Sequence, residues 1–568
     1  MTTPGLVSRL FTALVLFLAS LACPSDASAL RAANENPRPE KVLIEARTIA
    51  SEIQDPIQRA EALEQILIAQ ISLAPSDARD TLKRFPQLPN RLNQFAALAS
   101  VYAKGGDVDE AERMYAEIRL EDRGSQKGKL ASAAARGALA VAYANAGKMD
   151  DAFRIVGQIR EQFRDNPPAI VESALADIAA AQARRGDVAG AIRTATGIAS
   201  ANPQVLIGIV AGQVQAGDLP GAQQIISGLD EGLQRYAQWG IVQAQKDRGR
   251  LTDAQITASA IKPGHAKASA LLELAQYHLK TGNKTNAVGL LQEAATAARS
   301  TTNEWAKADI LWRIAAAMAE AGETFTALET ARGIEKDGHR RFAMLDIVKA
   351  QARQGDFKGA FNNALLLKQE GGDDVAESGY ESAVAEVLAE LTRSGRAKEA
   401  KEAVGNFEDL RHRRWILLGR IAWAQAEAGD IPGAKATLTL ADPEQQRTAR
   451  RKDLLRLSQV PREHLSTDDQ NRLQAFHEMD GMVHWTLDAI AKAQARKGDL
   501  RGAVVAADGF SQPSYRASLF REIGVTQAKS GRANQALGWA RALQSVSDKA
   551  YALLGIAQGL AGTKSPSR

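Results

Sequence analysis

The sequence predicts an all-α protein, an α-solenoid of about 13–14 helix-turn-helix hairpins that form a superhelix. Alanine makes up about a fifth of the 568 residues, whereas aromatic residues make up only 5%. This composition favours closely packed helices and argues against a β-sandwich or barrel. A short template also recurs along the chain, mostly at intervals of 31–34 or 39–41 residues. Repeats of this length are typical of stacked helical hairpins.

The template is an aliphatic residue, seven further residues, a glycine, four further residues and an alanine. It occurs twelve times, and we call its glycines the anchor glycines. They are Gly106, Gly147, Gly186, Gly217, Gly249, Gly282, Gly322, Gly355, Gly395, Gly429, Gly498 and Gly531. The interval between the tenth and the eleventh is about twice the usual one, which indicates a repeat that has lost its glycine.

The physical meaning of one repeat can be read from residues 136–159. Leu139, Ala140 and Tyr143 lie three or four residues apart and form one stripe of a helix. Gly147 stands where that helix ends and the backbone needs a positive φ. Ala152 then lies where the second helix crosses the first, since a larger side chain would force the two axes apart.

These residues resemble the tetratricopeptide repeat. The family's Leu, small residue, Tyr, Gly and Ala match Leu139, Ala140, Tyr143, Gly147 and Ala152 at the family's spacings. The early Trp and the closing Pro of the family are mostly absent, and its Tyr position usually holds Gln. The resemblance implies a right-handed superhelix that binds other proteins along its concave face.

The N-terminal segment, residues 1–29, resembles a secretory signal peptide. Arg9 precedes an apolar run over residues 10–22, and Ala27-Ser28-Ala29 is a cleavage pattern of small residues. We therefore expect an exported protein, periplasmic or secreted. The alternative is a lipid anchor on Cys23, the one cysteine of the chain. No later segment is apolar enough to predict a transmembrane span.

The remaining chain divides by its repeats. Residues 30–41 are expected to be a linker and residues 42–90 a degenerate N-terminal repeat. Tetratricopeptide-like repeats follow over residues 91–440. Residues 441–480 form a degenerate, basic segment, and residues 481–568 hold the C-terminal repeats and a cap.

Aromatic residues are the first candidates for partner binding. In the register of the tetratricopeptide family, the positions near the sixth, tenth and thirteenth before the anchor glycine line the concave groove. Those positions hold Tyr236, Trp239, Trp312, Trp423 and Trp485. Aromatic side chains supply a large contact area at low entropic cost. The alternative is that they fill the core between repeats.

Two repeated polar patterns have structural explanations. An Asp follows six of the anchor glycines, and we expect it to cap the second helix. A Gln stands four residues before seven of them, at Gln182, Gln213, Gln245, Gln351, Gln425, Gln494 and Gln527. This Gln either bonds to neighbouring repeats and fixes their register, or faces the groove and binds a peptide backbone.

Arginines around residues 411–451 are candidates for an anion or partner site. They are Arg411, Arg413, Arg414, Arg447, Arg450 and Arg451. His464, His477 and His484 lie nearby beside acidic residues, but their spacing fits no standard metal motif. The alternative to both sites is a degenerate repeat with solvated helix faces.

The sequence thus predicts an exported, non-catalytic scaffold that binds protein or peptide partners of the cell envelope. We expect no cofactor, because phosphate-binding loops, dinucleotide fingerprints and nucleophile motifs are absent from the sequence. The first alternative is a glycan- or peptidoglycan-binding protein, and the second is a metal-dependent site in residues 440–490. Nucleic acid is excluded as a partner on the net charge of +5, on basic residues that do not follow the repeat, and on export.

Overall fold

The computed structural model describes residues 37–121, 125–164, 169–199, 204–227, 229, 231–369, 374–442, 452–453, 456–457, 460, 464–509 and 513–562. Within these ranges the secondary structure consists of helices, so the predicted all-α solenoid is confirmed. The expected signal peptide, Cys23 and most of the linker lie outside the described residues. None of the described helices is long and apolar enough to cross a membrane.

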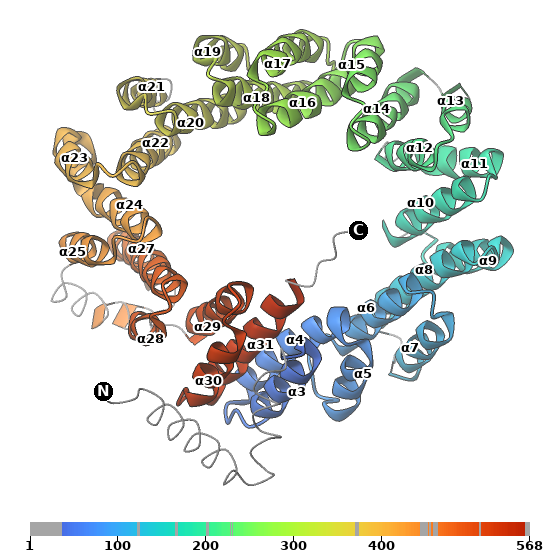
Figure 1. The fold of residues 1–568 in the computed structure, drawn as a ribbon, viewed down its shortest axis with the longest axis horizontal. Helices are drawn as coiled ribbons and strands as arrows, with labels where there is room; N and C mark the ends of the chain where they lie inside the picture. The colour runs from blue at the N-terminus through green and yellow to red at the C-terminus, as the bar shows by residue number, and fades with distance from the viewer. Residues whose placement is uncertain are drawn as a thin grey trace, which may run out of the picture. The chain divides into compact units, whose positions relative to one another are not determined.

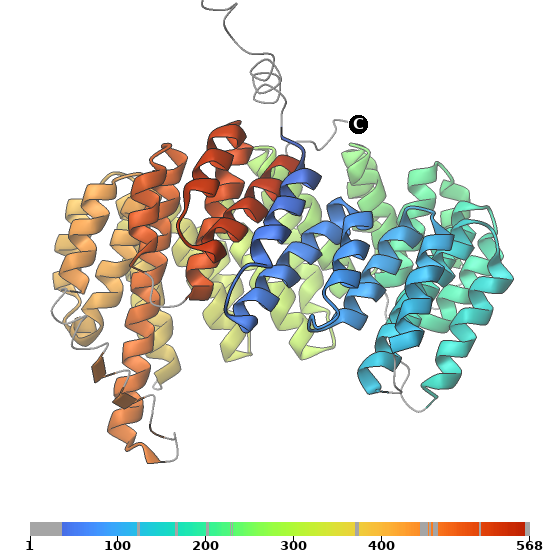
Figure 2. The ribbon, with the colours of Figure 1, turned by 90° about the horizontal axis from the view of Figure 1, so that it is seen from below.

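The described helices form thirteen hairpins (Figures 1 and 2). The first helices are α4 (Pro56–Leu73), α6 (Arg91–Lys104), α8 (Gln126–Asn145), α10 (Ala169–Arg184), α12 (Gln204–Ala216), α14 (Glu231–Asp247), α16 (His265–Lys280), α18 (Glu304–Ala321), α20 (Asp337–Arg353), α22 (Asp374–Arg393), α24 (Arg414–Glu427), α27 (Thr467–Arg496) and α29 (Pro513–Lys529). The second helices are α5 (Pro75–Arg84), α7 (Val108–Glu121), α9 (Met149–Gln162), α11 (Val188–Ala199), α13 (Leu219–Ser227), α15 (Leu251–Ala260), α17 (Lys284–Arg299), α19 (Thr324–Arg332), α21 (Phe357–Gln369), α23 (Ala397–Ala403), α25 (Ile431–Ala441), α28 (Leu500–Ala507) and α30 (Ala533–Ala542). Two further helices, α3 (Pro39–Ala50) and α31 (Val546–Gly562), stand at the ends of the array, and short 3-10 turns η1 (Val404–Asn406) and η2 (Glu408–Arg413) follow α23.

The anchor glycines end the first helices, as predicted. All twelve have φ between +73° and +96°, a region that side chains larger than hydrogen adopt at a cost. The residue after the glycine donates its N–H to the carbonyl five residues earlier, for example Asp187 to Gln182 and Glu323 to Met318. This bond and the one from the glycine N–H form a Schellman closure of the helix.

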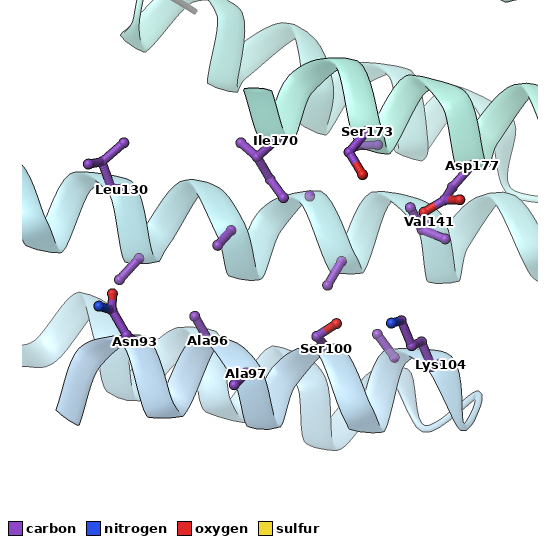
Figure 3. A pocket seen from close by; sticks show the side chains of 16 residues that line it. Asn93, Ala96, Ala97, Ser100, Lys104, Leu130, Val141, Ile170, Ser173 and Asp177 are labelled. Carbon is purple, nitrogen blue, oxygen red and sulfur yellow. The ribbon is translucent and has the colours of Figure 1, made fainter. Parts of the chain in front are cut away.

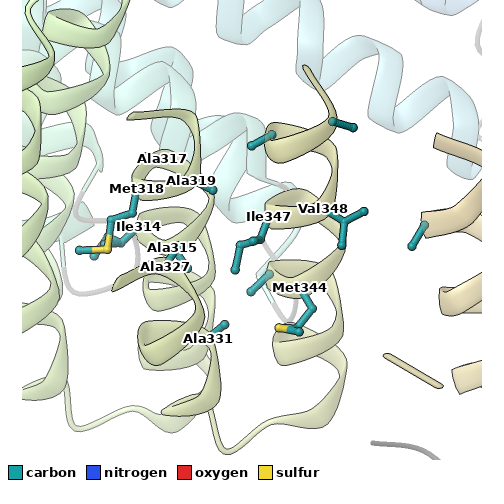
Figure 4. Packing of buried hydrophobic residues seen from close by; sticks show 14 of the residues in the cluster. Ile314, Ala315, Ala317, Met318, Ala319, Ala327, Ala331, Met344, Ile347 and Val348 are labelled. Carbon is teal, nitrogen blue, oxygen red and sulfur yellow. The ribbon is translucent and has the colours of Figure 1, made fainter. Parts of the chain in front are cut away.

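The template alanine is the closest-packed position of each hairpin. All twelve template alanines are fully buried, and the aliphatic residues eight positions before the anchor glycines are buried with them. Figure 4 shows the arrangement at α18, α19 and α20, where Ala327 and Ala331 of the second helix face Ile314 and Ala315 of the first. The next first helix adds Met344 and Ile347 to the same core. The core therefore runs from hairpin to hairpin instead of being closed within one.

The Gln and the Asp of the two patterns belong to one hydrogen-bond network inside the hairpin. Asp430 caps α25 by accepting the Gly433 N–H at 3.0 Å, as predicted. Gln425 donates to the same carboxylate at 2.8 Å and accepts from Thr437 of the second helix at 2.6 Å. Gln182 and Gln351 repeat this arrangement.

The expected bond between repeats occurs at two other members of the pattern. Gln213 donates to the carbonyl of Ala183 in the preceding repeat at 2.9 Å, and Gln527 donates to that of Ala495. All seven glutamines are buried. The side-chain amides of six of them, all but Gln245, donate hydrogen bonds within or between hairpins, which contradicts the interpretation that the pattern as a whole faces a groove and binds a peptide.

The described helices group into two compact units. Unit 1 comprises residues 1–89 and 494–568, and unit 2 comprises residues 90–493. In unit 2 the first helices of successive hairpins contact one another and form one layer, while the second helices form the other (Figure 1).

Unit 1 brings the two ends of the array together. The N-terminal helix α3 packs along the C-terminal helix α31, and α31 also contacts α4. Helix α3 begins at Pro39, inside the segment expected to be a linker. It buries Val42, Leu43 and Ala46, and Glu45 accepts two bonds from Arg541 at 2.7 and 2.8 Å. The ends thus form a composite hairpin, with α31 as its first helix and α3 as its second.

Candidate functional site

A cavity of unit 2 is lined by residues of α6, α8 and α10, which are all first helices (Figure 3). It has a volume of about 570 Å³. Its lining includes Asn93, Ala96 and Ser100 of α6, which hold the thirteenth, tenth and sixth positions before the anchor glycine, and the equivalent residues of α8. We call this surface the first-helix face. The three offsets that the sequence assigned to a groove therefore line it.

The five aromatic candidates lie on first helices at these offsets. Tyr236 and Trp239 are on α14, Trp312 is on α18, Trp423 on α24 and Trp485 on α27. The first four are half-buried, and Trp485 is 65% exposed. The sequence left open whether these residues line the groove or fill the core. Tyr236, Trp239 and Trp312 do part of both, because they pack against the core and still have accessible surface.

Two of the tryptophans are held by a carboxylate of the next repeat. The indole N–H of Trp239 donates to Glu273 at 2.9 Å, and that of Trp312 donates to Asp346 at the same distance. In both cases the acceptor lies 34 residues later in the chain. Since each indole has a fixed orientation, it loses little conformational entropy when a ligand contacts it.

Glu273 is an ionised carboxylate in a half-buried site. Lys246 and Gln243 also donate to it. Burial alone would raise the pKa of the Glu273 carboxyl, but the bonds from Lys246 and Trp239 outweigh burial and lower this pKa below its usual value. The indole N–H of Trp239 therefore donates its hydrogen bond to a negatively charged group.

A group of neighbouring aromatic rings, two of them exposed, lies on α18 and α20. Trp305 is 64% exposed and Phe342 is 53% exposed. The ring centroid of His339 lies 5.4 Å from that of Trp305 and 6.1 Å from that of Trp312. Trp312 and Phe342 are 5.1 Å apart by the same measure. We call these four residues the aromatic cluster.

Sequence reasoning missed three members of this cluster. Phe342 holds the thirteenth position before Gly355, so the same offset rule would have found it had phenylalanine been counted with Trp and Tyr. Trp305 and His339 hold the seventeenth and sixteenth positions before their anchor glycines, one helical turn beyond the offsets used. Their proximity depends on how α18 packs on α20, which the spacing alone does not show.

Trp423 and Trp485 line a second, smaller cavity between α24 and α27. Its volume is about 320 Å³, and its lining includes Arg420, Met482 and Asp488. The guanidinium carbon atoms of Arg393 and Arg420 lie 4.9 and 4.4 Å from the Trp423 ring centroid. Arg420 also pairs with Glu386, which neutralises its charge.

The predicted arginine site is divided by the structure. Arg411 and Arg414 line a cavity of about 510 Å³ together with Lys401 and Trp415. Arg413 points elsewhere, to Glu381 at 3.2 Å and Glu478 at 2.7 Å, so its charge is already compensated. Arg447, Arg450 and Arg451 lie outside the described residues.

The histidines do not converge. His477 is exposed on α27, whereas His484 is buried on the same helix with Asp480 at 3.7 Å. In the described part of the chain no three His, Cys, Asp or Glu side chains are placed to hold a metal ion. The described residues of the segment 440–490 thus give no support to the metal alternative.

Comparisons with known proteins bear on the fold of this chain. No family model matches the chain, and no curated protein matches it. One similar structure is that of the pentatricopeptide repeat protein PPR10 in complex with an 18-nucleotide psaJ RNA element, at 13% identity, 100% coverage of this chain, 88% of the other and a TM-score of 0.35. A circular tandem repeat protein matches at 11% identity over 93% and 96% of the two chains, with a TM-score of 0.14. Ton1535 from Thermococcus onnurineus NA1 matches at 17% identity over 60% and 94%, with a TM-score of 0.24.

One prediction from the sequence needs correction. Nucleic acid was excluded as a partner, and this exclusion is wrong, because two structures similar to this chain are complexes of PPR10 with an RNA element. A modest net charge does not remove RNA from the partners that a helical-repeat protein can have.

Proposed function

We propose that this chain is an exported, non-catalytic scaffold that binds a protein or peptide partner along the first-helix face of unit 2. The aromatic cluster of Trp305, Trp312, His339 and Phe342 is the observation that carries the proposal. The resemblance of the repeat to the tetratricopeptide family supports it. The signal-peptide pattern of residues 1–29 supports export.

The cluster has the properties of a binding hot spot. Exposed Trp and Phe side chains leave apolar surface in water, and large aromatic side chains dominate the energy of protein interfaces. Trp312 is held by Asp346, and its ring contacts those of His339 and Phe342. A partner side chain that packs on the exposed rings of Trp305 or Phe342 would thus meet a preformed surface.

The test is selection of binding peptides from a displayed random library on the purified chain, followed by affinity measurement. We expect the double variant Trp305→Ala/Phe342→Ala to bind the selected peptides at least about 30-fold more weakly, because hot-spot truncations cost about 2 kcal/mol or more. Phe325→Ala is the matched control, since Phe325 is 76% exposed on the second helix of the same hairpin. Its affinity should stay unchanged.

Two outcomes would contradict the proposal. An equal loss of peptide affinity in Phe325→Ala would show that any exposed aromatic surface of the hairpin binds the peptides. Binding of a random-sequence RNA pool that is lost in the double variant, with no peptide selected, would assign the face to nucleic acid instead.

A glycan is the second candidate, and the cavity between α24 and α27 favours it. A sugar ring could stack on Trp485, while Arg420 and Asp488 bond to its hydroxyls. Trp485→Ala should then abolish binding to immobilised peptidoglycan fragments, whereas Phe325→Ala should not. Retained binding in Trp485→Ala would remove this candidate.

A further inference from the structure

Unit 1 contains a polar cavity whose walls come from both ends of the chain. Its volume is about 450 Å³. Helix α4 contributes Glu61 and Gln65, α29 contributes Ser518 and Arg521, and α31 contributes Ser547 and Tyr551. All of its lining residues belong to unit 1, so the cavity is independent of the function proposed for the first-helix face of unit 2.

The two charged groups of this cavity are uncompensated. Arg521 makes a hydrogen bond of 3.4 Å to Gln65 Oε1. Neither Arg521 nor Glu61 takes part in an ion pair with any residue that the structure describes. Glu61 lies about one helical turn before Gln65 on α4. The carboxylate comes from α4 and the guanidinium from α29, so the two charges line the cavity from different helices.

Tyr551 lies within the field of both charges. Burial and the charge of Glu61 together raise the pKa of the Tyr551 hydroxyl to about 12, and the charge of Arg521 opposes this rise. The hydroxyl is therefore protonated at neutral pH and can donate a hydrogen bond into the cavity. Ser518 and Ser547 add two more hydroxyls.

We propose that this cavity binds a zwitterion, with the ligand's ammonium group on Glu61 and its carboxylate on Arg521. A ligand with a single charge would leave one of the two protein charges unpaired and be repelled by it. Charge-assisted hydrogen bonds to both groups satisfy the whole site. The volume is in the range of small-molecule sites, and the ligand chemistry is that of a free amino acid or a short peptide with unblocked ends.

The position of the cavity gives binding a structural consequence. Since α4 belongs to the N-terminal end and α29 and α31 to the C-terminal end, a bound zwitterion connects the two ends. A ligand that binds only the assembled unit stabilises it by mass action. Saturating ligand should therefore slow backbone amide exchange in α4 and α31.

The experiment is calorimetric titration of the purified chain with L-alanine and with alanyl-alanine, each also as its N-acetyl form and its C-terminal amide. We expect one of the two free compounds to bind, and either block to weaken it at least tenfold. Tighter binding of L-alanine identifies a free amino acid as the ligand class, and tighter binding of the dipeptide identifies peptides.

Charge variants assign each end of the probe. Glu61→Gln should bind weakly and lose the discrimination between free and N-acetylated probe, whereas Arg521→Gln should lose the discrimination against the amide. Glu52→Gln and Lys529→Gln, which change exposed charges of unit 1 outside the cavity, are the controls and should keep both. Failure of both free compounds to bind, or blocked forms that bind as tightly, would overturn the proposal.

Discussion

At the scale of single residues, the tryptophans of the first-helix face are anchored before any partner arrives. Trp239 and Trp312 each donate to a carboxylate of the following repeat, so each indole connects two hairpins as well as facing outward. The same separation of 34 residues produces this contact twice. Residues that could have been either core or binding surface are, in this fold, part of both.

The anchoring of Trp239 predicts a pH dependence. The lowered pKa of Glu273 means that its contribution to stability is present above the usual carboxyl pKa of about 4.3 and is lost as pH falls through the lowered folded value. At pH 7, Glu273→Gln should therefore unfold at a lower urea concentration than the unchanged chain. Its free energy of unfolding should be lower by about 1 kcal/mol. The difference should shrink at pH 3.

Glu329→Gln provides the comparison for this measurement. Glu329 makes an exposed pair with Arg332, three residues along α19, and exposed pairs contribute little to stability. Its urea midpoint should differ little from that of the unchanged chain at either pH. An equal and pH-independent effect of both variants would refute the role of Glu273.

At the scale of the element, each hairpin depends on two positions with opposite requirements. The anchor glycine is needed for its backbone conformation, and the space around Gly322 is open. The template alanine is needed for its size, because Ala327 is fully buried between the helices. Sequence spacing reveals both positions, since each requirement recurs in every hairpin and neither depends on distant residues.

A pair of Gly→Ala variants separates these effects. Gly322 has φ +96°, and an alanine there should destabilise the chain by about 1–2 kcal/mol from backbone strain. Gly289 lies on the exposed side of α17, also without neighbours within 4 Å, and an alanine there should stabilise by about 0.5–1 kcal/mol. Thermal unfolding should thus shift in opposite directions. Shifts of the same sign would contradict the strain argument.

At the scale of the whole molecule, the array uses its own first helix to cover its last one. The apolar residues of α31 would be exposed at the end of an open solenoid, a position that repeat proteins close with a capping element. Here α3 supplies that cover from the opposite end of the chain. The core of unit 1 is thus completed by segments from the two ends of the sequence.

Reversing the charge at the junction of the ends tests this arrangement. Glu45→Arg should accelerate amide exchange in α31 several-fold, because two arginines would then face each other, and Glu45→Arg/Arg541→Glu should restore the original rate. The exposed pair Lys262–Glu231 of unit 2, 2.7 Å apart, provides a control whose reversal should leave α31 unchanged. Hydrogen exchange with mass spectrometry measures all three. No rescue in the double variant would show that the pair does not hold the ends.

The sequence by itself determined the helical hairpins, the glycines that end the first helices, the buried alanines and the offsets that line the first-helix face. These depend on spacings within one hairpin, which repetition makes visible. Tertiary structure alone decided that His339 contacts both Trp305 and Trp312. It also decided that Arg413 turns to Glu381 and Glu478 while Arg411 and Arg414 share a cavity, and that α3 packs on α31. Each of these depends on contacts between helices that are separate in the chain, and no local periodicity encodes them.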